Sequence, residues 1–398
     1  MKGNLVIVFF LALNFPVSGQ QEFQKKFQRL FIETSNDSVI QLPEGTFLLD
    51  GSLWMDDKRN VVIRGAGEDK TILDFGGQVS GAEGIKITDS DHITVEELTV
   101  RNTKGDGIKA QQVNGIIFRN LKTVWTNGPH KKNGGYGLYP VQCTNVMIDR
   151  CTASGASDAG IYVGQSKFIV VKNSKAYENV AGIEIENSLH ADVYDNEVYN
   201  NTGGILVFDL PDLIQKKGGY IRVFNNNIHD NNHNNFAPKG NIVGKVPPGT
   251  GLMILATHNV EAFENKIINN VTAGTAIISY HMTENPIHDS AYDAYPSDIY
   301  LHDNYYERPN VRATGRGRMG KMYRFKLRFG KDVPHIIYDG IEDKTRPERK
   351  ICIRNNANAT FANLNAEAGF KNVSRDLSAH DCEQRPLEPI VLPVNPEE

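Results

Sequence analysis

Between Thr144 and Pro211 the chain repeats one pattern of hydrophobic and polar positions three times. Each copy runs from a β-rich segment through a polar corner to a small residue, a glycine and a second β-rich segment, as in GIYVGQS, GIEIENS and GILVFDLP. The three glycines, Gly160, Gly182 and Gly204, lie 22 residues apart. A fixed period in this range is typical of a solenoid, in which each repeat forms one coil.

The alternation within each glycine-led strand predicts that its two aliphatic residues point inward and the residues between them point outward. Glycine just before the strand permits a tight corner with positive φ. An asparagine recurs at one corner of the coil, where stacked amides can bond the turn backbone of the next coil. It stands at Asn120, Asn173, Asn196, Asn226, Asn265 and Asn304. We therefore predict an all-β fold, a right-handed parallel β-helix.

The repeats cover most of the chain and divide it into three parts. Residues 1–20 have the features of a signal peptide, with Lys2 at the front, an apolar core too short to span a bilayer comfortably, and PVSGQ at the cleavage site. Residues 21–32 (QEFQKKFQRLFI) have the apolar spacing of a short helix that caps the exposed end of a solenoid. We predict about ten coils within residues 21–310. Residues 311–398 are predicted to be an irregular tail that packs on the β-helix, in which KMYRFKLRF alternates like an edge strand.

Charge and cysteine usage restrict the binding partners and the cellular compartment of the protein. The formal net charge of −4 and the pI near 6.3 argue against nucleic acid as a partner. No apolar span follows the signal peptide, so we expect a secreted or periplasmic monomer with no membrane span. Cys352 and Cys382 bracket the irregular tail and are the predicted disulfide. Cys143 and Cys151 lie inside the repeats, either as buried thiols or as a second pair.

The spacing between glycines locates two insertions, near residues 127–136 and within residues 210–250. The outward positions of the glycine-led strands form two columns, which are polar in the N-terminal coils and apolar in the C-terminal coils. The first column reads Lys109, Tyr139, Tyr162, Glu184, Leu206, Met253 and Ile278, and the second reads Gln111, Val141, Gly164, Glu186, Phe208, Leu255 and Tyr280. We expect the second insertion or the tail to cover the apolar half. The polar half is expected to form an open trough for a sugar polymer, because aromatic rings stack on the C–H faces of sugars.

The polar half of the columns contains two glutamates on one face of one strand. Glu184 and Glu186 are roughly 6.6 Å apart along it, a separation that suits the acid and base of inverting glycoside hydrolysis. The same pair, with Asp209 nearby, offers the oxygen ligands that calcium prefers, and calcium is the one cofactor considered. Two solvated glutamates are the third alternative. As substrate-binding residues we consider Glu184, Glu186, Asp209 and His233, the last on the second insertion.

Neighbouring positions offer cations and groups for proton transfer. His130 and Lys132 lie on the first insertion, where either can neutralise a uronate carboxylate or act as a base. Lys109, at the start of the first column, is a further cation. Tyr139 and Tyr162, on the predicted floor of the trough, are the candidates for proton transfer. These five residues are the predicted catalytic set.

From about Ser38 to Asn310 these strands and asparagine corners resemble the right-handed parallel β-helix proteins of the pectin-lyase-like superfamily. Within that group the repeats are similar to the carbohydrate-binding and sugar-hydrolase type, with mannuronan-epimerase-like and NosD-like proteins at a greater distance. The resemblance implies the fold and export. The Asp-Pro-His-Asp motif of mannuronan epimerases is absent, as are the Gly-His-Gly and Arg-Ile-Lys signatures of polygalacturonases, so no catalytic residue is carried over.

The leading hypothesis is a lyase or C5-epimerase that acts on an acidic, uronate-containing polysaccharide or oligosaccharide, favoured over a glycoside hydrolase. Such chemistry requires a cation to stabilise an enolate, together with a base and an acid. The alternative is a non-catalytic polysaccharide-binding or structural β-helix, or a NosD-like periplasmic maturation factor. That alternative predicts no cluster of ionisable groups on the trough floor.

Overall fold

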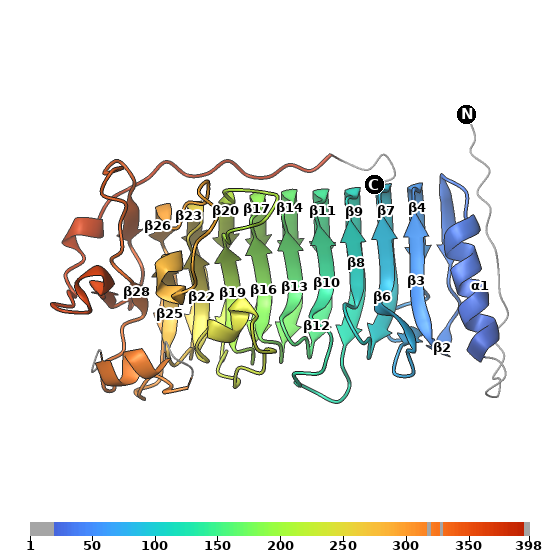
Figure 1. Ribbon diagram of the computed structural model, residues 1–398, viewed down its shortest axis with the longest axis horizontal. Coiled ribbons are helices and arrows are strands. Elements are labelled where there is room, and N and C mark those ends of the chain that lie inside the picture. The colour runs from blue at the N-terminus through green and yellow to red at the C-terminus, as the bar shows by residue number, and fades with distance from the viewer. Residues whose placement is uncertain (1–19, 317–319, 327–328, 394–398) are drawn as a thin grey trace.

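The computed structural model describes residues 20–316, 320–326 and 329–393, which wind into a long stack of parallel strands (Figure 1). Residues 1–19, nearly all of the predicted signal peptide, lie outside the described residues. A sheet of eleven strands runs the length of the stack. Its strands are β3 (Gly51–Asp56), β6 (Ser80–Thr88), β8 (Ile108–Gln111), β10 (Tyr136–Val141), β13 (Ala159–Gly164), β16 (Ala181–Glu186), β19 (Gly203–Phe208), β22 (Thr250–Leu255), β25 (Ala273–Ile278), β28 (Ile336–Tyr338) and β30 (Phe361–Asn363).

The other two faces of each coil belong to one nineteen-strand sheet, because β7 (Asp91–Arg101) and β9 (Asn114–Val124) run through the corner between them. The strands of one face are β1 (Ser38–Gln41), β4 (Arg59–Arg64), β11 (Thr144–Asp149), β14 (Lys167–Lys172), β17 (Leu189–Tyr194), β20 (Gly219–Phe224), β23 (His258–Phe263), β26 (Ser297–His302) and β29 (Ile351–Arg354). Those of the other are β2 (Gly45–Leu48), β5 (Thr71–Asp74), β12 (Thr152–Ser154), β15 (Lys175–Tyr177), β18 (Glu197–Tyr199), β21 (Asn227–His229), β24 (Lys266–Ile268) and β27 (Tyr305–Glu307). Neighbouring strands pair in parallel, which confirms the predicted all-β parallel β-helix.

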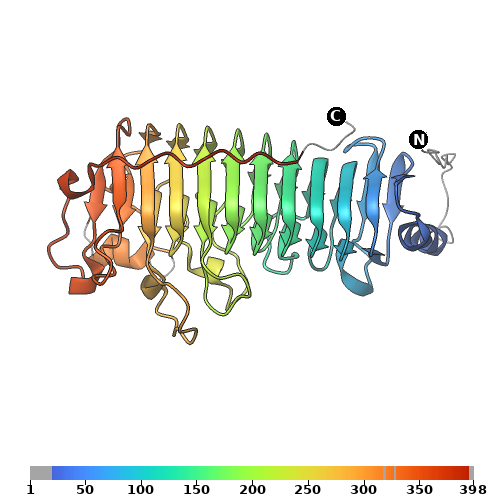
Figure 2. The same ribbon diagram turned by 90° about the horizontal axis from the view of Figure 1, so that it is seen from above.

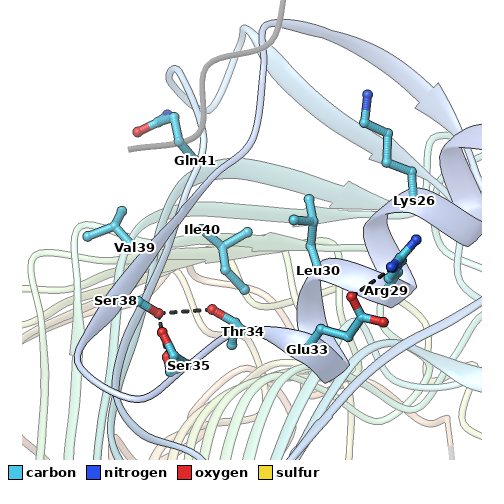
Figure 3. Close-up of a pocket in the computed structure, with 10 residues that line it drawn as sticks. All are labelled: Lys26, Arg29, Leu30, Glu33, Thr34, Ser35, Ser38, Val39, Ile40 and Gln41. Carbon is cyan, nitrogen blue, oxygen red and sulfur yellow. Dashed lines mark hydrogen bonds and ion pairs between the residues drawn. The ribbon is translucent and has the colours of Figure 1, made fainter. Parts of the chain in front are cut away.

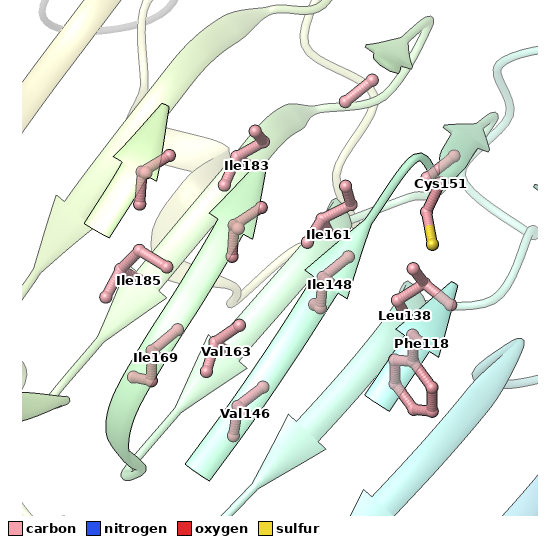
Figure 4. Packing of buried hydrophobic residues seen from close by; sticks show 14 of the residues in the cluster. Phe118, Leu138, Val146, Ile148, Cys151, Ile161, Val163, Ile169, Ile183 and Ile185 are labelled. Carbon is pink, nitrogen blue, oxygen red and sulfur yellow. The ribbon is translucent and has the colours of Figure 1, made fainter. Parts of the chain in front are cut away.

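Aliphatic side chains fill the interior of the coils. Ile161 and Val163 of β13 stand in register with Ile183 and Ile185 of β16, and all four side chains are buried (Figure 4). The inward positions of the alternating pattern are therefore confirmed. Because each coil repeats the same inward positions, one continuous hydrophobic core runs through the stack.

The repeat glycines are required for close packing rather than for a left-handed corner. A Cβ atom at Gly160 would lie 2.6 Å from Nδ2 of Asn179, and one at Gly182 would lie 2.3 Å from Cγ1 of Val198. The expected positive φ at these glycines is wrong, because the chain adopts the left-handed conformation after the strand instead, as at Gln165 with φ of 51°.

The register also corrects the outward columns at their C-terminal ends. Ala276 stands beside Met253, and Ile278 stands beside Leu255. The predicted ends of the two columns, Ile278 and Tyr280, are therefore each two residues too far along the chain. The ordinary repeat of 23 residues separates Met253 from Ala276.

Asparagines form two ladders along corners of the coil, and all of them except Asn356 are buried. The first consists of Asn196, Asn226, Asn265, Asn304 and Asn356, with Nδ2–Oδ1 distances of 2.8–3.0 Å. The second, which the repeat pattern does not reveal, consists of Asn179, Asn201, Asn231 and Asn270. Asn173 and Asn120 are outside both ladders, since Ser174 rather than Asn173 donates its backbone N–H to Asn196.

The N-terminal end of the stack is closed by the helix α1 (Gln20–Glu33), which confirms the predicted cap. Phe27 and Phe31 are buried, and the ring of Phe27 lies 5.1 Å from that of Phe47. A pocket of about 360 Å³ lies between α1 and β1 (Figure 3). Its polar groups pair among themselves, as Arg29 does with Glu33 at 2.7 Å.

Parallel strands continue beyond Asn310, because β28, β29 and β30 extend both sheets. The predicted disulfide between Cys352 and Cys382 is confirmed, whereas Cys143 and Cys151 are free buried thiols. Short helices connect the late coils: η2 (Ile242–Lys245), η3 (Tyr280–Thr283), η5 (Ala366–Ala368) and η6 (Ser378–His380). Met322–Lys326 is a π-helical turn (η4), so the predicted edge strand in KMYRFKLRF is wrong for these residues.

The last described residues run back along the outside of the stack (Figures 1 and 2). The backbone N–H of Leu387 donates to Glu261 at 2.9 Å, and that of Ile390 donates to Asp192 at 3.1 Å. This end of the chain therefore packs on the nineteen-strand sheet and leaves the eleven-strand sheet uncovered by it. In the described part of the chain, no helix is long and apolar enough to cross a membrane.

Candidate active site

Four predicted site residues stand on four neighbouring strands of the eleven-strand sheet. Lys109 on β8 is in register with Tyr139 on β10, and Tyr162 on β13 is in register with Glu184 on β16. The ring centroids of Tyr139 and Tyr162 are 5.0 Å apart, and the Lys109 ammonium lies 4.9 Å from the Tyr139 centroid. The predicted first column is therefore correct from Lys109 to Glu184.

A third tyrosine completes an aromatic cluster at this place. The ring of Tyr136, the first residue of β10, lies 4.5 Å from the rings of both Tyr139 and Tyr162. It has room because the positions beside it on β13 and β16 are Ala159 and Ala181. Burial raises the pKa of all three hydroxyls above the ordinary phenol value, so they stay protonated at neutral pH.

The two glutamates of β16 are buried beneath these rings. The hydroxyl of Tyr162 donates to Oε1 of Glu186 at 2.7 Å, and burial raises the pKa of Glu186 to about 7. Glu184 is 1% exposed, and neither of its carboxyl oxygens has a hydrogen-bond partner among the described residues. Burial, with Asp158 and Glu186 nearby, raises the pKa of Glu184 well above its usual value. Burial therefore favours the uncharged form of Glu184, whose carboxyl oxygens have free hydrogen-bonding capacity.

Two aspartates complete the site. Asp158 precedes β13 and is buried, and Nδ2 of Asn241 donates to its Oδ2 at 2.6 Å. Burial raises the pKa of Asp158 to about 7. Asp106, before β8, accepts the backbone N–H of Tyr136 at 3.3 Å, and burial raises its pKa to about 6 against the opposing charge of Lys109.

We refer to these eight side chains as the tyrosine–carboxylate cluster: Asp106, Lys109, Tyr136, Tyr139, Asp158, Tyr162, Glu184 and Glu186. Asp106, Lys109, Tyr136 and Tyr139 are partly exposed and form its open side, whereas the other four are buried. The cluster combines one cation, three protonated phenols and four carboxyl groups whose pKa values are raised. Such a combination of perturbed groups is typical of a catalytic site.

The floor of the expected trough is covered rather than open. Residues 231–249 fold over it, and Asn241 of this segment contacts Asp158 directly. Val243 and Val246 are buried against the apolar half of the columns, where Leu206 and Met253 are also buried. Both elements predicted to cover the apolar half contribute, because Tyr323 and Phe329 of the tail are buried in the same cluster. Glu184 is buried as well. The expectation of an open floor at Glu184 is therefore wrong.

A pocket of about 390 Å³ lies at the carboxyl ends of the same strands. Its lining includes Gln112, Gln142 and Gln165, which directly follow β8, β10 and β13. Oε1 of Gln165 accepts the backbone N–H of Ile214 at 3.0 Å, so the segment after β19 forms one wall. The volume is that of a small-molecule site, and the three amides offer donors and acceptors for hydroxyl groups.

Of the other predicted site residues, Asp209 lies near Glu186, whereas the residues on the two insertions lie elsewhere. His130 and Lys132 are exposed, and the ring of His130 accepts a hydrogen bond from the backbone N–H of Lys132 at 3.1 Å. His233 bonds to the backbone carbonyl of the next residue and contacts the ring of Phe236. Asp209 is buried after β19, where burial raises its pKa to about 7. The structure brings none of the three insertion residues into contact with the cluster residues.

The arrangement does not fit a calcium site formed by Glu184, Glu186 and Asp209. Across the described ranges, no group of three or more His, Cys, Asp or Glu side chains is placed to hold a metal ion. Calcium takes six to eight oxygen ligands, and these three carboxyl groups are not placed to supply them together. The structure therefore supports no step that uses calcium.

Sequence reasoning missed Asp106, Tyr136 and Asp158. Asp106 and Tyr136 occupy the position directly before the repeat glycine, where the next three coils have alanine or glycine. Asp158 lies one residue earlier in the repeat. A polar or bulky residue at a position that is otherwise small is the signal that could have identified them.

Comparison with known proteins supports the fold. A family model described as a right-handed beta helix region matches residues 83–216. The chain is similar to the A-module of the mannuronan C-5 epimerase AlgE4 of Azotobacter vinelandii, with 15% identity and a TM-score of 0.54, over 85% of this chain and 90% of that one. No curated protein matches the sequence. The chain therefore has a right-handed parallel β-helix fold, and the predicted handedness is confirmed.

Two further solved structures are similar at lower scores. The A-module of the mannuronan C-5 epimerase AlgE6 of Azotobacter vinelandii has 14% identity and a TM-score of 0.43, over 85% of this chain and 91% of that one. The pectate lyase Pel9A has 13% identity and a TM-score of 0.42, over 93% of this chain and 84% of that one. At these identities the likeness concerns the fold.

Proposed function

We propose that this protein acts on uronate-containing polysaccharides by removing the proton at C5, as a lyase or a C5-epimerase. The observation that carries the proposal is the meeting of a lysine, three protonated tyrosines and the unpartnered acid Glu184 on neighbouring strands. Relatives of similar fold include proteins named as mannuronan epimerases and a pectate lyase, which agrees with this chemistry. A purely structural β-helix would have no reason to bury such a cluster.

Removal of the C5 proton requires that the neighbouring carboxylate of the sugar be neutralised, because negative charge develops on it in the transition state. Lys109 supplies a positive charge on the open side of the cluster. Glu184 stands three strand steps, about 14 Å, from Lys109, and its unpartnered carboxyl oxygens can hydrogen-bond an adjoining part of the sugar chain. The two groups would hold the substrate at two separate points.

The proton itself is moved by Asp106 and by a tyrosine of the cluster. Asp106 has a pKa of about 6, so it is ionised above that pH and can act as the base. The phenols of Tyr139 and Tyr162 remain protonated, so either can act as the acid. Donation to the glycosidic oxygen at C4 gives a lyase, and donation to C5 from the opposite face gives an epimerase.

We also infer that the protein is exported and works as a monomer. The disulfide Cys352–Cys382 supports export, because such bonds persist in oxidising compartments. The signal-peptide pattern in residues 1–20 of the sequence agrees with it. Acidic polysaccharides outside the cytosol would then be the substrate.

The test is incubation of the purified protein with alginate, pectate and glycosaminoglycans in deuterated buffer. We expect either absorbance near 235 nm from unsaturated products or new epimer signals by NMR, with deuterium at C5. Tyr139→Phe and Lys109→Gln should lower the rate by about 10²–10⁴-fold. Tyr177→Phe, on β15 of the other sheet, is the matched control and should leave the rate unchanged.

Three outcomes would overturn the proposal in different ways. Binding of a uronate polymer without unsaturation, epimerisation or deuterium uptake indicates the non-catalytic β-helix, including a NosD-like role. New reducing ends without unsaturation indicate hydrolysis by Glu184 and Glu186 instead. Neither binding nor reaction with any uronate removes acidic polysaccharides as the substrate class.

A further inference from the structure

The first outward column extends beyond Lys109 toward the N-terminal end of the stack. Register pairs Lys109 on β8 with Lys86 on β6, and Lys86 with Trp54 on β3. Trp54 is 46% exposed, and both lysines are partly exposed. We refer to Trp54, Lys86 and Lys109 as the lysine strip. It leads directly to Tyr139 and the tyrosine–carboxylate cluster.

The strip has the chemistry of a binding surface for anionic sugars. Neither Lys86 nor Lys109 forms an ion pair with a carboxylate of the described residues, so both charges are available to a ligand. Nε1 of Trp54 donates to Oγ1 of Thr88 at 3.1 Å, which restrains the indole at the surface. Indole faces stack on the C–H faces of sugars, and ammonium groups pair with carboxylates.

The dimensions of the strip match a polymer. Adjacent strands are about 4.8 Å apart, so the two lysines are spaced by about one hexuronate unit and Trp54 lies about 14 Å from Tyr139. At its outer end the strip meets α1, where Gln28 holds the backbone of Trp54 through two hydrogen bonds of 2.9 and 3.0 Å. The strip therefore has space for about three sugar units on a rigid strand framework.

The column is closed at its other end. Exposure falls from 46% at Trp54 to 4% at Tyr162, 1% at Glu184 and 0% at Leu206. From β19 onward the outward positions are buried in a second hydrophobic cluster with Val243 and Val246. A polymer that lies on the strip can therefore approach Glu184 but cannot continue past it.

We propose that the lysine strip binds the body of a uronate chain whose end unit occupies the tyrosine–carboxylate cluster, so that the enzyme acts on chain ends rather than in the middle of the polymer. The inference rests on the proposed function of the cluster and adds the direction and mode of substrate binding. The two lysines pair with the carboxylates of successive sugar units. Because the positions beyond Glu184 are buried, the site has room for only one terminal unit.

The test uses uronate oligosaccharides of two to six units, labelled at the reducing end, and the full-length polymer. We expect mono- or disaccharide products from the first time points and little loss of polymer viscosity. Trp54→Ala and Lys86→Gln should each raise KM roughly 3–10-fold for tetramers and longer chains, and less for dimers. Lys172→Gln, on β14 of the other sheet, is the matched control and should change KM for no length.

The outcomes separate this inference from the proposed function. Turnover with mid-length products and a rapid fall in viscosity overturns chain-end action while the C5 chemistry stands. Equal effects of Trp54→Ala on dimers and hexamers overturn the strip. If no uronate is turned over, calorimetry with the same oligosaccharides decides: affinity that rises with length in the wild type and is lost in Trp54→Ala supports the strip, and length-independent or absent binding overturns it.

Discussion

Glu186→Gln is expected to make the protein less sensitive to alkaline pH. Glu186 is buried, accepts a hydrogen bond from Tyr162 and has a pKa raised from 4.5 to about 7. The folded state therefore retains this proton in a pH range where the unfolded chain releases it. By linkage, the stabilising contribution is present below the unfolded pKa and is lost as the pH rises through the folded pKa.

The size of the effect follows from the two pKa values. A shift from 4.5 to about 7 corresponds to about 3 kcal/mol once the pH exceeds both values, and most of that loss, about 2–3 kcal/mol, falls between pH 5 and pH 8. Glutamine cannot lose a proton and still accepts the hydrogen bond of Tyr162. The variant should therefore gain stability relative to the wild type as the pH rises.

The assay is urea unfolding of both proteins at pH 5, 6, 7 and 8, with the difference in free energy of unfolding plotted against pH. Glu197→Gln is the matched control, because Glu197 is paired with Lys175 on the surface and its pKa is lowered rather than raised. That variant should show no gain at high pH. Parallel curves for the wild type and Glu186→Gln would refute the burial argument, and carboxyl NMR of Glu186 in the wild type provides a second, direct measurement.

Three further perturbations test other parts of the structure. Reduction of Cys352–Cys382, or Cys352→Ser, should lower the free energy of unfolding by about 3–4 kcal/mol, because the disulfide closes a loop of 30 residues. Thermal unfolding should show a lower Tm, and the control variant Cys143→Ala should show no such shift. Asn226→Asp replaces a donor in the ladder and should cost about 3 kcal/mol, whereas the same change at the exposed neighbour Asn225 should cost under about 1 kcal/mol by urea unfolding. Asn241→Ala removes the contact with Asp158 and should speed amide hydrogen exchange of residues 231–249 by about 5–10-fold. Asn234→Ala is the control, and an unchanged exchange rate in Asn241→Ala would refute the prediction.

The repeating parts of this fold are predictable from sequence because two periods carry the information. Alternation with period two assigns each side chain to the inside or outside of a strand, and the spacing of 22–23 residues assigns the neighbour on the next strand. Together they correctly align Lys109, Tyr139, Tyr162 and Glu184. Where the second period shifts by one residue, the alignment fails, as it does for Asn173 and Ser174.

The rest of the site depends on contacts that have no period. Asp158 is held by Asn241, 83 residues later, and nothing in the spacing of the repeats relates these two positions. The position of residues 231–249 on the sheet depends on the packing of Val243 and Val246 against the outward apolar residues. The outward apolar residues predict that some segment covers them, but they do not predict how far toward Glu184 the covered area extends.

The apolar half of the columns and the two glutamates are buried side by side. Leu206 and Phe208 stand in register with Glu184 and Glu186 on the neighbouring strand, and all four side chains are buried, as are Met253 and Leu255. Each of these apolar side chains contributes about 1.5–3 kcal/mol on burial, so two of them are enough to offset the cost of about 3 kcal/mol that ionised Glu186 imposes above pH 7.

The covering segment should therefore stay in place across neutral pH even when Glu186 loses its proton. Opening has to be driven by the ligand, since a uronate chain that bonds Glu184 with one unit and pairs with Lys109 through another supplies partners that the closed state lacks. The binding energy of the substrate is then used to expose Glu184, the acid that bonds the substrate.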